Sequence, residues 1–155
     1  MLELYRKKWR EKLYIDTSKL AIKALIELRK IDYQKWQPIS CPLLDGDLVY
    51  FNKDGFYHLT HNGRGKIRNQ SDQRMRLNLL PNAPVVIKRA RGFGAMPRTI
   101  PAAENKYGKD ILFYELVYQF NTKKAVTVVI RKIGNGQLHF YSVRFCKRKV
   151  SKKIA

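Results

Sequence analysis

Acidic residues are scarce in this chain. Its 12 aspartate and glutamate residues stand against 32 lysine and arginine residues, for a formal net charge of +20. The carboxylates are scattered and form no pair suited to two catalytic metal ions, which disfavours a two-metal nuclease. Because so large a charge of one sign destabilises a compact protein by self-repulsion, we expect a polyanionic partner. The excess is spread along the chain and indicates RNA or DNA as the partner without indicating an activity.

Cysteine and histidine are also few. Cys41 and Cys146 match no metal-binding or redox spacing, so we expect two free thiols in a reducing compartment, with one disulfide as the alternative. Three histidines without cysteine or carboxylate neighbours make a poor metal site. The glycine patterns of P-loops and dinucleotide-binding folds are missing, so we expect no cofactor. No apolar run is long enough for a transmembrane helix and no signal-peptide core is present, so we expect a cytoplasmic protein without a membrane partner.

The first half of the chain has helical signals. Apolar residues recur at helical spacing from Leu20 to Leu28, which predicts an amphipathic helix packed on a sheet. Residues 37–47 predict a connector and residues 48–51 a short strand. Ser71 is expected to cap a second helix, before two prolines end it. Residues 89–109 contain five glycines and prolines and predict a long loop.

The last third of the chain predicts a sheet. Residues 110–120, 125–133 and 137–145 are rich in valine, isoleucine, phenylalanine and tyrosine, with short connections between them. We therefore expect an α+β fold in which N-terminal helices are followed by a C-terminal antiparallel β-meander. A length of 155 residues predicts one domain. Within residues 1–155 we expect a helical extension (1–47), a core (48–146) and a basic tail (147–155).

A hairpin turn at Asn135-Gly136 predicts how the last two strands pair. Both residues tolerate the positive φ of a type I′ turn, which would place Ile133 opposite Leu138 and Arg131 opposite Phe140. Alternation then separates two faces of the sheet, and a one-residue slip or bulge would exchange the faces of Tyr141 and Ser142. The polar face would carry Thr127, Arg131, Ser142 and Arg144, and the apolar face, which takes the helices, would carry Val126, Val128, Ile130, Tyr141, Val143 and Phe145.

Residues 49–81 contain most of the side chains that could act in catalysis or bind phosphate. Asp54-Gly55 predicts a cap and turn, after which His58 and His61 would share a face of a short helical turn. Because imidazole titrates near neutrality, this pair suits the base and acid of RNA cleavage, with packing or surface histidines as the alternative. Neighbouring cations would bind phosphate or stabilise the transition state, unless they form a plain solvated face: Arg64, Lys66, Arg68, Arg74 and Arg76.

The predicted polar sheet face supplies further candidates. Arg131 and Arg144 would hold phosphate there, and Thr127 or Ser142 would donate a hydrogen bond to a nonbridging oxygen. An ordinary solvated face is the alternative. His139 is a weaker candidate, because cross-strand packing accounts for it. The expected catalytic residues are His58, His61, Arg64, Thr127 and Ser142, and the expected nucleic-acid-binding residues are Lys66, Arg68, Arg74, Arg76, Arg131 and Arg144, with no metal ligand.

Residues 48–146 resemble the barnase–EndoU–colicin–RelE (BECR-fold) ribonucleases, particularly their phage-associated branch. The resemblance rests on the order of elements and on three segments, GFYHLTH, RMRLNLLP and LHFYSVRF. It implies metal-independent RNA cleavage by 2′-OH attack to a 2′,3′-cyclic phosphate, by a toxin or effector that an acidic inhibitor or antitoxin protein holds in check. It also implies a site built from His58 or His61, Arg64 and its neighbours, and Ser142. A noncatalytic RNA- or DNA-binding protein is the alternative.

Overall fold

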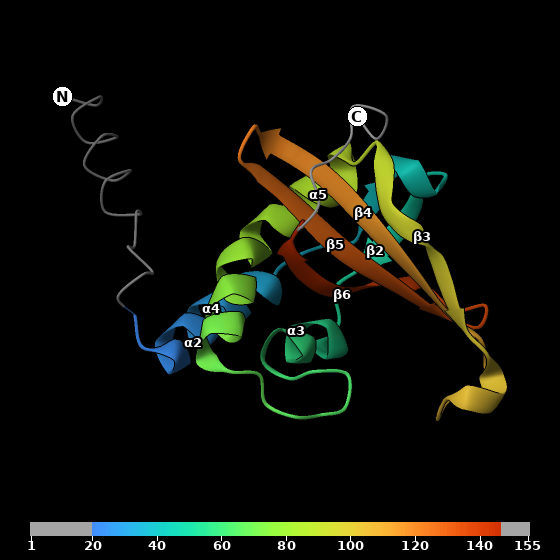
Figure 1. Cartoon of the computed structure of the whole chain (residues 1–155), viewed down its shortest axis with the longest axis horizontal. Coiled ribbons are helices and arrows are strands. Elements are labelled where there is room, and N and C mark those ends of the chain that lie inside the picture. Colours follow the sequence, from blue (N-terminus) through green and yellow to red (C-terminus); the bar gives the residue numbers. More distant parts are fainter. Residues whose placement is uncertain (1–19, 147–155) are drawn as a thin grey trace.

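The computed structural model describes residues 20–146. Its helices pack around a single mixed sheet (Figure 1). Six strands lie side by side in the order β1-β2-β6-β5-β4-β3. Neighbouring strands are antiparallel except for β2 and β6, which are parallel. The strands are β1 (Ile39–Cys41), β2 (Asp47–Tyr50), β3 (Gly92–Ile100), β4 (Ile111–Asn121), β5 (Lys124–Ile133) and β6 (Leu138–Phe145).

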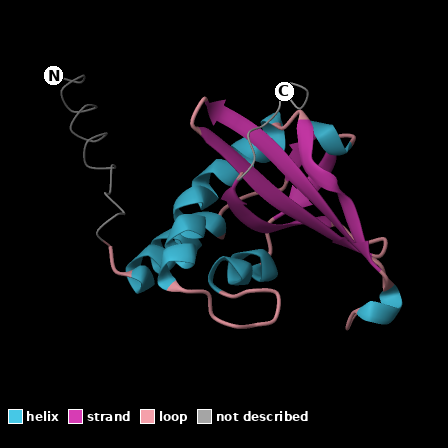
Figure 2. Cartoon of the chain, in the orientation of Figure 1, coloured by secondary structure: helices cyan, strands magenta, loops and turns pink. Residues whose placement is uncertain are grey.

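The helices precede most of the strands in the chain, and the predicted α+β class is confirmed (Figure 2). They are α2 (Ile22–Tyr33), α3 (Lys53–Thr60), α4 (Gln70–Leu79) and α5 (Ala83–Arg89), with short 3-10 turns at Pro42–Leu44, Leu80–Asn82 and Ala102–Glu104. None of the helices within residues 20–146 combines the length and the apolar character needed to cross a membrane.

The main core lies between the helices and one face of the sheet. Leu25 of α2, Leu77 of α4 and Ile87 of α5 are fully buried there with Val128 and Phe140 of the sheet. The predicted amphipathic helix is therefore confirmed as α2. The predicted second helix is confirmed as α4, although Asn69 and not Ser71 caps it, by accepting a hydrogen bond from the Asp72 amide. The predicted basic tail, residues 147–155, lies outside the described residues, as do residues 1–19.

The predicted loop at residues 89–109 is wrong, because Gly92–Ile100 within it form β3. Its glycines and proline fit an edge strand, where a missing amide does not break a ladder on both sides. The pairing of β3 with β4 also shifts register twice, between Phe93 and Ala95 and between Ala95 and Arg98. Gly94 and Pro97 fall in these two irregularities, where a strand tolerates such residues.

The three late strands are confirmed as β4, β5 and β6, but the register near the turn is wrong by one residue. Val129 pairs with Ser142 and Thr127 with Arg144, as expected, whereas Lys132 and not Ile133 lies opposite Leu138, and Arg131 pairs with His139 and not with Phe140. A register shift between Val129 and Ile130 absorbs the difference. The turn also differs, since its positive φ is at Gly134 and not at Asn135 or Gly136.

This shift corrects the position of Tyr141, which was expected on the apolar face. Tyr141 packs with Ile111, Phe113 and Val129, in a small cluster on the face opposite the helices, which we call the open face. Ser142 keeps its pairing with Val129 and stays on this face as well. The bulge therefore adds an aromatic ring to the polar face that the sequence predicts.

Helix α3 fills the place beside β6 where β2 stops. The two strands pair only through Val49 with Leu138 and Tyr50 with His139. Beyond them, a Cβ atom at Gly55 would lie 2.3 Å from the Phe140 carbonyl oxygen, so only glycine fits. The predicted cap at Asp54-Gly55 is wrong, because the Asn52 side chain caps α3 by accepting a hydrogen bond from the Gly55 amide. This tight contact fixes α3 at the rim of the open face.

Candidate active site

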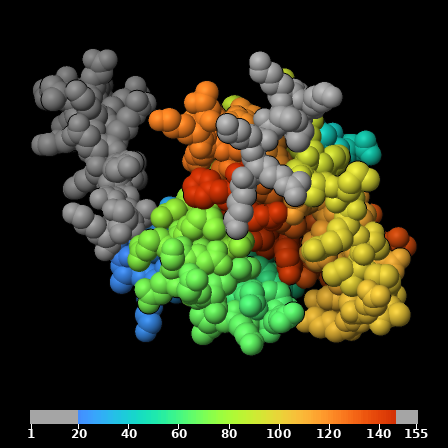
Figure 3. All heavy atoms as spheres, viewed as in Figure 1, coloured from blue at the N-terminus to red at the C-terminus, as the bar shows by residue number. Residues whose placement is uncertain are grey.

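The open face is hollowed by a cavity of about 410 Å³. In the space-filling view it lies between the green atoms of the α3–α4 segment and the yellow atoms of β3, with the late strands at its base (Figure 3). We call it the arginine cavity, after four of the residues that line it. They are Arg68, Arg76, Ala95, Met96, Arg98, Phe113, Glu115, Val129, Tyr141, Ser142 and Arg144.

Arg76 of α4 is held in one orientation by three groups. Its Nε donates to Asp72 at 2.9 Å, and its Nη1 donates to the Ser142 hydroxyl at 2.6 Å and to the Val143 carbonyl at 3.2 Å. Only 12% of its side chain is exposed. Burial, and then the nearby Arg68, lowers the pKa of Arg76. A guanidinium stays protonated in proteins. An anion bound beside Arg76 would therefore stabilise its charge against the effects of burial and of Arg68.

Arg68 lies next to Arg76 and shares its carboxylate. Its Nη1 donates to Asp72 at 3.1 Å, and its Nε donates to the His58 carbonyl at 3.0 Å. Asp72 therefore bridges two guanidinium groups and spaces them apart. Such charge-assisted pairs orient the planar donors of arginine toward a third group.

The other two arginines of the lining belong to strands, Arg98 to β3 and Arg144 to β6. Arg144 donates from Nη2 to the Glu115 carboxylate. The Arg98 guanidinium lies 4.9 Å from the centre of the Phe113 ring, and Arg98 forms no ion pair with a carboxylate in residues 20–146. Four arginines thus face two carboxylates, Asp72 and Glu115, and the cavity keeps an excess of positive charge. It is suited to a phosphate group.

The two candidate histidines point to different places, and the prediction that they share a helical face is wrong. Helix α3 ends at Thr60, and His61 has an extended backbone that bridges to Ile67. The His61 ring stacks on Tyr57, with centroids 4.0 Å apart. The His58 ring instead lies 4.1 Å from the Tyr141 ring, at the margin of the arginine cavity.

A buried cation lies beneath Tyr141 and next to His58. The Arg131 side chain is 7% exposed, contacts Asp54 at 3.4 Å and lies 4.8 Å from the centre of the Tyr141 ring. Burial first, and the Arg131 charge second, lowers the pKa of His58 and of His139. Both imidazoles are therefore neutral at physiological pH. Their Nδ1 atoms are buried without a hydrogen-bond partner in the part of the chain that the structure describes.

The structure divides the predicted site residues into three groups. Arg68, Arg76, Ser142 and Arg144 line the arginine cavity, and His58 and Arg131 border it through Tyr141. Thr127 lines a neighbouring cavity and does not line this one. The others lie outside both linings: His61 against Tyr57, the exposed Arg64 and Lys66 on the turn after α3, and Arg74 on α4.

Sequence reasoning missed Glu115 and Arg98. Arg98 lay in a predicted loop, so no face could be assigned to it. Glu115 is the one charged residue of β4, whose sequence is ILFYELVYQFN. A single carboxylate in an otherwise uncharged strand is the signal that indicates it, since such a charge costs stability unless it is paired or functional.

Neither the possible metal ligands among the described residues nor the comparisons with known proteins assign a function to the chain. No group of three or more histidine, cysteine, aspartate or glutamate side chains within residues 20–146 is placed to hold a metal ion. Cys41 and Cys146 do not form a disulfide, as expected of two thiols. Comparison of the chain with models of protein families, with curated proteins and with solved structures gives no match.

Proposed function

We propose that this protein is a metal-independent endoribonuclease, related to the BECR-fold group, that works on the open face of its sheet. One observation carries the proposal: three arginines held by hydrogen bonds, Arg68, Arg76 and Arg144, line a cavity that also contains a carboxylate and a hydroxyl group. RNA suits such a site because its 2′-OH is an internal nucleophile. The protein then has to supply a base, an acid and charge stabilisation for the phosphorane.

The positions of the side chains suggest their roles. Arg76 and Arg144 both line the arginine cavity and would hold the nonbridging oxygens, with the Ser142 hydroxyl beside Arg76. Such preorganised donors need no rearrangement as charge develops, which is the main source of electrostatic catalysis. Glu115 lines the same cavity and is the group we assign to accept the 2′-OH proton.

His58 is the group we assign to protonate the leaving 5′-oxygen. Its imidazole is neutral in the free protein, because burial and Arg131 lower its pKa. A bound phosphate beside it would favour the protonated form, since an opposite charge counteracts both effects. His58 would then gain its proton as RNA binds. In this proposal Glu115 acts as the base and His58 as the acid.

Cleavage of labelled RNA in excess EDTA tests this proposal. We expect products that end in 2′,3′-cyclic phosphate, and we expect Glu115→Gln and His58→Ala to abolish them. His61→Ala is the matched control, because His61 stacks on Tyr57 outside the cavity. RNA that stays intact while it is bound would overturn the nuclease assignment.

A noncatalytic RNA- or DNA-binding protein is the second candidate function. The exposed Arg64 and Lys66 and the net charge of +20 favour it, since contacts of this kind need no catalytic geometry. Such a protein would bind single-stranded DNA and RNA with similar, steeply salt-sensitive affinity and would leave both intact.

Control by an inhibitor forms part of the nuclease proposal. A cytoplasmic toxin or effector of this kind would need an acidic inhibitor or antitoxin protein, whose carboxylates would pair with the cavity arginines. Arg98, which lacks a carboxylate partner in residues 20–146, is the residue most available to it. Loss of inhibition in Arg98→Ala, with cleavage retained, is the expected result.

A further inference from the structure

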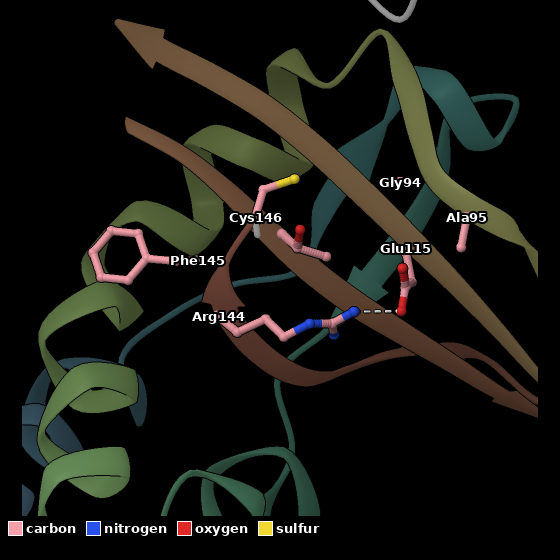
Figure 4. A pocket seen from close by; sticks show the side chains of 7 residues that line it. Gly94, Ala95, Glu115, Arg144, Phe145 and Cys146 are labelled. Carbon is pink, nitrogen blue, oxygen red and sulfur yellow. Dashed lines mark hydrogen bonds and ion pairs between the residues drawn. The ribbon is translucent and has the colours of Figure 1, made fainter. Parts of the chain in front are cut away.

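A second cavity of about 330 Å³ adjoins the arginine cavity on the open face (Figure 4). We call it the Thr127 cavity. Glu115, Arg144 and Ala95 line both cavities, so the Glu115–Arg144 ion pair is a shared wall. Figure 4 shows the Arg144 side chain extended toward Glu115 within this lining. The complete lining consists of Gly94, Ala95, Glu115, Thr127, Arg144, Phe145 and Cys146.

The chemistry of the Thr127 cavity differs from that of its neighbour. Apart from the shared ion pair, its lining is uncharged. Thr127 is only 3% exposed, and its hydroxyl forms no hydrogen bond with any other residue of the described chain. A hydroxyl can both donate and accept, so this group is available to hydrogen-bond a ligand in the cavity. The cavity suits a neutral, polar and planar group better than a second phosphate.

The wall formed by β3 adds backbone groups and space. Gly94 falls in the register shift between Phe93 and Ala95, so it has no partner in the pairing with β4. The amide and carbonyl of a bulged residue are left out of the ladder and are available to a ligand. A Cβ atom at this position would lie 2.7 Å from Val117 Cγ2, so glycine allows β3 to approach β4 this closely.

We propose that the Thr127 cavity is a nucleobase subsite, which holds the base of the nucleotide whose phosphate lies in the arginine cavity. This inference rests on the proposed function for the identity of the phosphate ligand. The Thr127 hydroxyl and the Gly94 backbone hydrogen-bond to the edge of the base, and the Arg144 guanidinium offers a plane for stacking. A volume of about 330 Å³ is in the range of small-molecule sites.

Binding of small probes to the full-length protein tests the subsite. Uridine 3′-monophosphate and adenosine 3′-monophosphate are compared with ribose 5-phosphate and inorganic phosphate by calorimetry. We expect at least one of the nucleotides to bind about tenfold more tightly than ribose 5-phosphate, which corresponds to about 1.4 kcal/mol. Thr127→Val, which removes the hydroxyl at nearly constant shape, should reduce this ratio several-fold. Equal affinities for nucleotides and ribose 5-phosphate would overturn the proposal.

Alkylation of Cys146 gives a second measurement that needs no variant. Cys146 lines the cavity, whereas Cys41 is fully buried in the core and serves as the internal control. We expect iodoacetamide to modify Cys146 in the native protein, and we expect the nucleotide, but not phosphate, to slow that reaction. A rate unchanged by the nucleotide would count against the subsite.

The outcomes for the two proposals are distinguishable. If the nucleotide binds preferentially and protects Cys146 while RNA stays uncleaved, the subsite stands and the nuclease proposal fails. If RNA is cleaved but nucleotide and ribose 5-phosphate bind alike, the nuclease stands and the subsite fails.

Discussion

Two basic regions of this protein carry similar charge in different ways. The arginine cavity contains Arg76, which donates to a carboxylate, a hydroxyl and a carbonyl group. The turn after α3, residues 62–67, which we call the basic turn, carries the exposed Arg64 and Lys66. In that turn it is the backbone that is held, because the Asn62 side chain accepts hydrogen bonds from the amides of both residues.

The difference separates cations that attract a ligand from cations that are placed to act on it. An exposed cation is screened by salt and loses side-chain entropy when it binds, so it contributes little and without specificity. A guanidinium that is already fixed pays neither cost and acts at a defined point. The net charge of +20 indicates the sign of the ligand. Under the proposed function, Arg76 and Arg144 mark where the RNA would be cleaved.

The largest expected effect is on catalysis. Arg144→Ala should lower kcat for RNA cleavage by about 10²–10³-fold, the range for loss of one preorganised transition-state donor. The double variant Arg64→Ala/Lys66→Ala should lower it by less than about tenfold, since surface contacts contribute mainly to binding. Single-turnover rates at saturating RNA measure both. Similar losses in the two variants would show that the two regions do not differ.

A charge-conserving substitution sharpens the comparison. Arg76→Lys keeps the charge but cannot donate to Asp72, Ser142 and Val143 together, so buried acceptors lose their partners. We expect a loss of about 1–3 kcal/mol in the free energy of unfolding, measured with urea. Arg64→Lys, the matched control on the basic turn, should leave stability unchanged. An equally stable Arg76→Lys variant would show that charge alone matters in the cavity.

His58 lies beside the arginine cavity and His61 beside the basic turn, and the pH dependence of stability compares the two. Burial and Arg131 hold the pKa of His58 and His139 below the ordinary value of 6.5. The unfolded chain therefore binds more protons than the native protein as the pH falls below about 6.5, and stability decreases with acidification. His58→Gln should weaken this loss, in urea unfolding at pH 7.5, 6.5 and 5.5. His61→Gln, at the start of the basic turn, is the control, and equal slopes in the two variants would contradict the expectation.

The smallest expected effect concerns salt. Each phosphate contact on single-stranded nucleic acid contributes about 0.7 to the slope of log affinity against log salt. Removing both Arg64 and Lys66 should therefore lower that slope by about 1.4. Fluorescence anisotropy with labelled RNA at several salt concentrations measures it. An unchanged slope would show that RNA does not contact the basic turn.

Local patterns predicted much of the fold. The strands β4, β5 and β6 followed from alternation and β-branched residues, because those preferences agree with their pairing in the sheet. Strand β3 did not, since Gly94 and Pro97 are breakers in any local reading and are tolerated only at an edge with register shifts. The position of Tyr141 depended on a bulge that no local signal specifies.

The candidate site was predictable where one hairpin determines it. Alternation along β5 and β6 places Ser142 and Arg144 on the open face, and the structure has them there. Arg98 required knowledge of how β3 pairs with β4, which is a tertiary property, whereas the signal for Glu115 was a lone charge in β4. His58 and His61 were separated by the end of a helix at Thr60, a boundary that the sequence marks only weakly.

Gly55 and Arg76 together protect backbone that would otherwise be a template for aggregation. Beyond His139, β6 has no strand on the side away from β5, and an uncovered strand edge recruits other chains. The Phe140 carbonyl lies against Gly55, and the Val143 carbonyl accepts a hydrogen bond from Arg76. A larger residue at position 55 would push α3 away and open this edge to intermolecular pairing. The helix that carries His58 thus also covers a stretch of β6 that no strand pairs with.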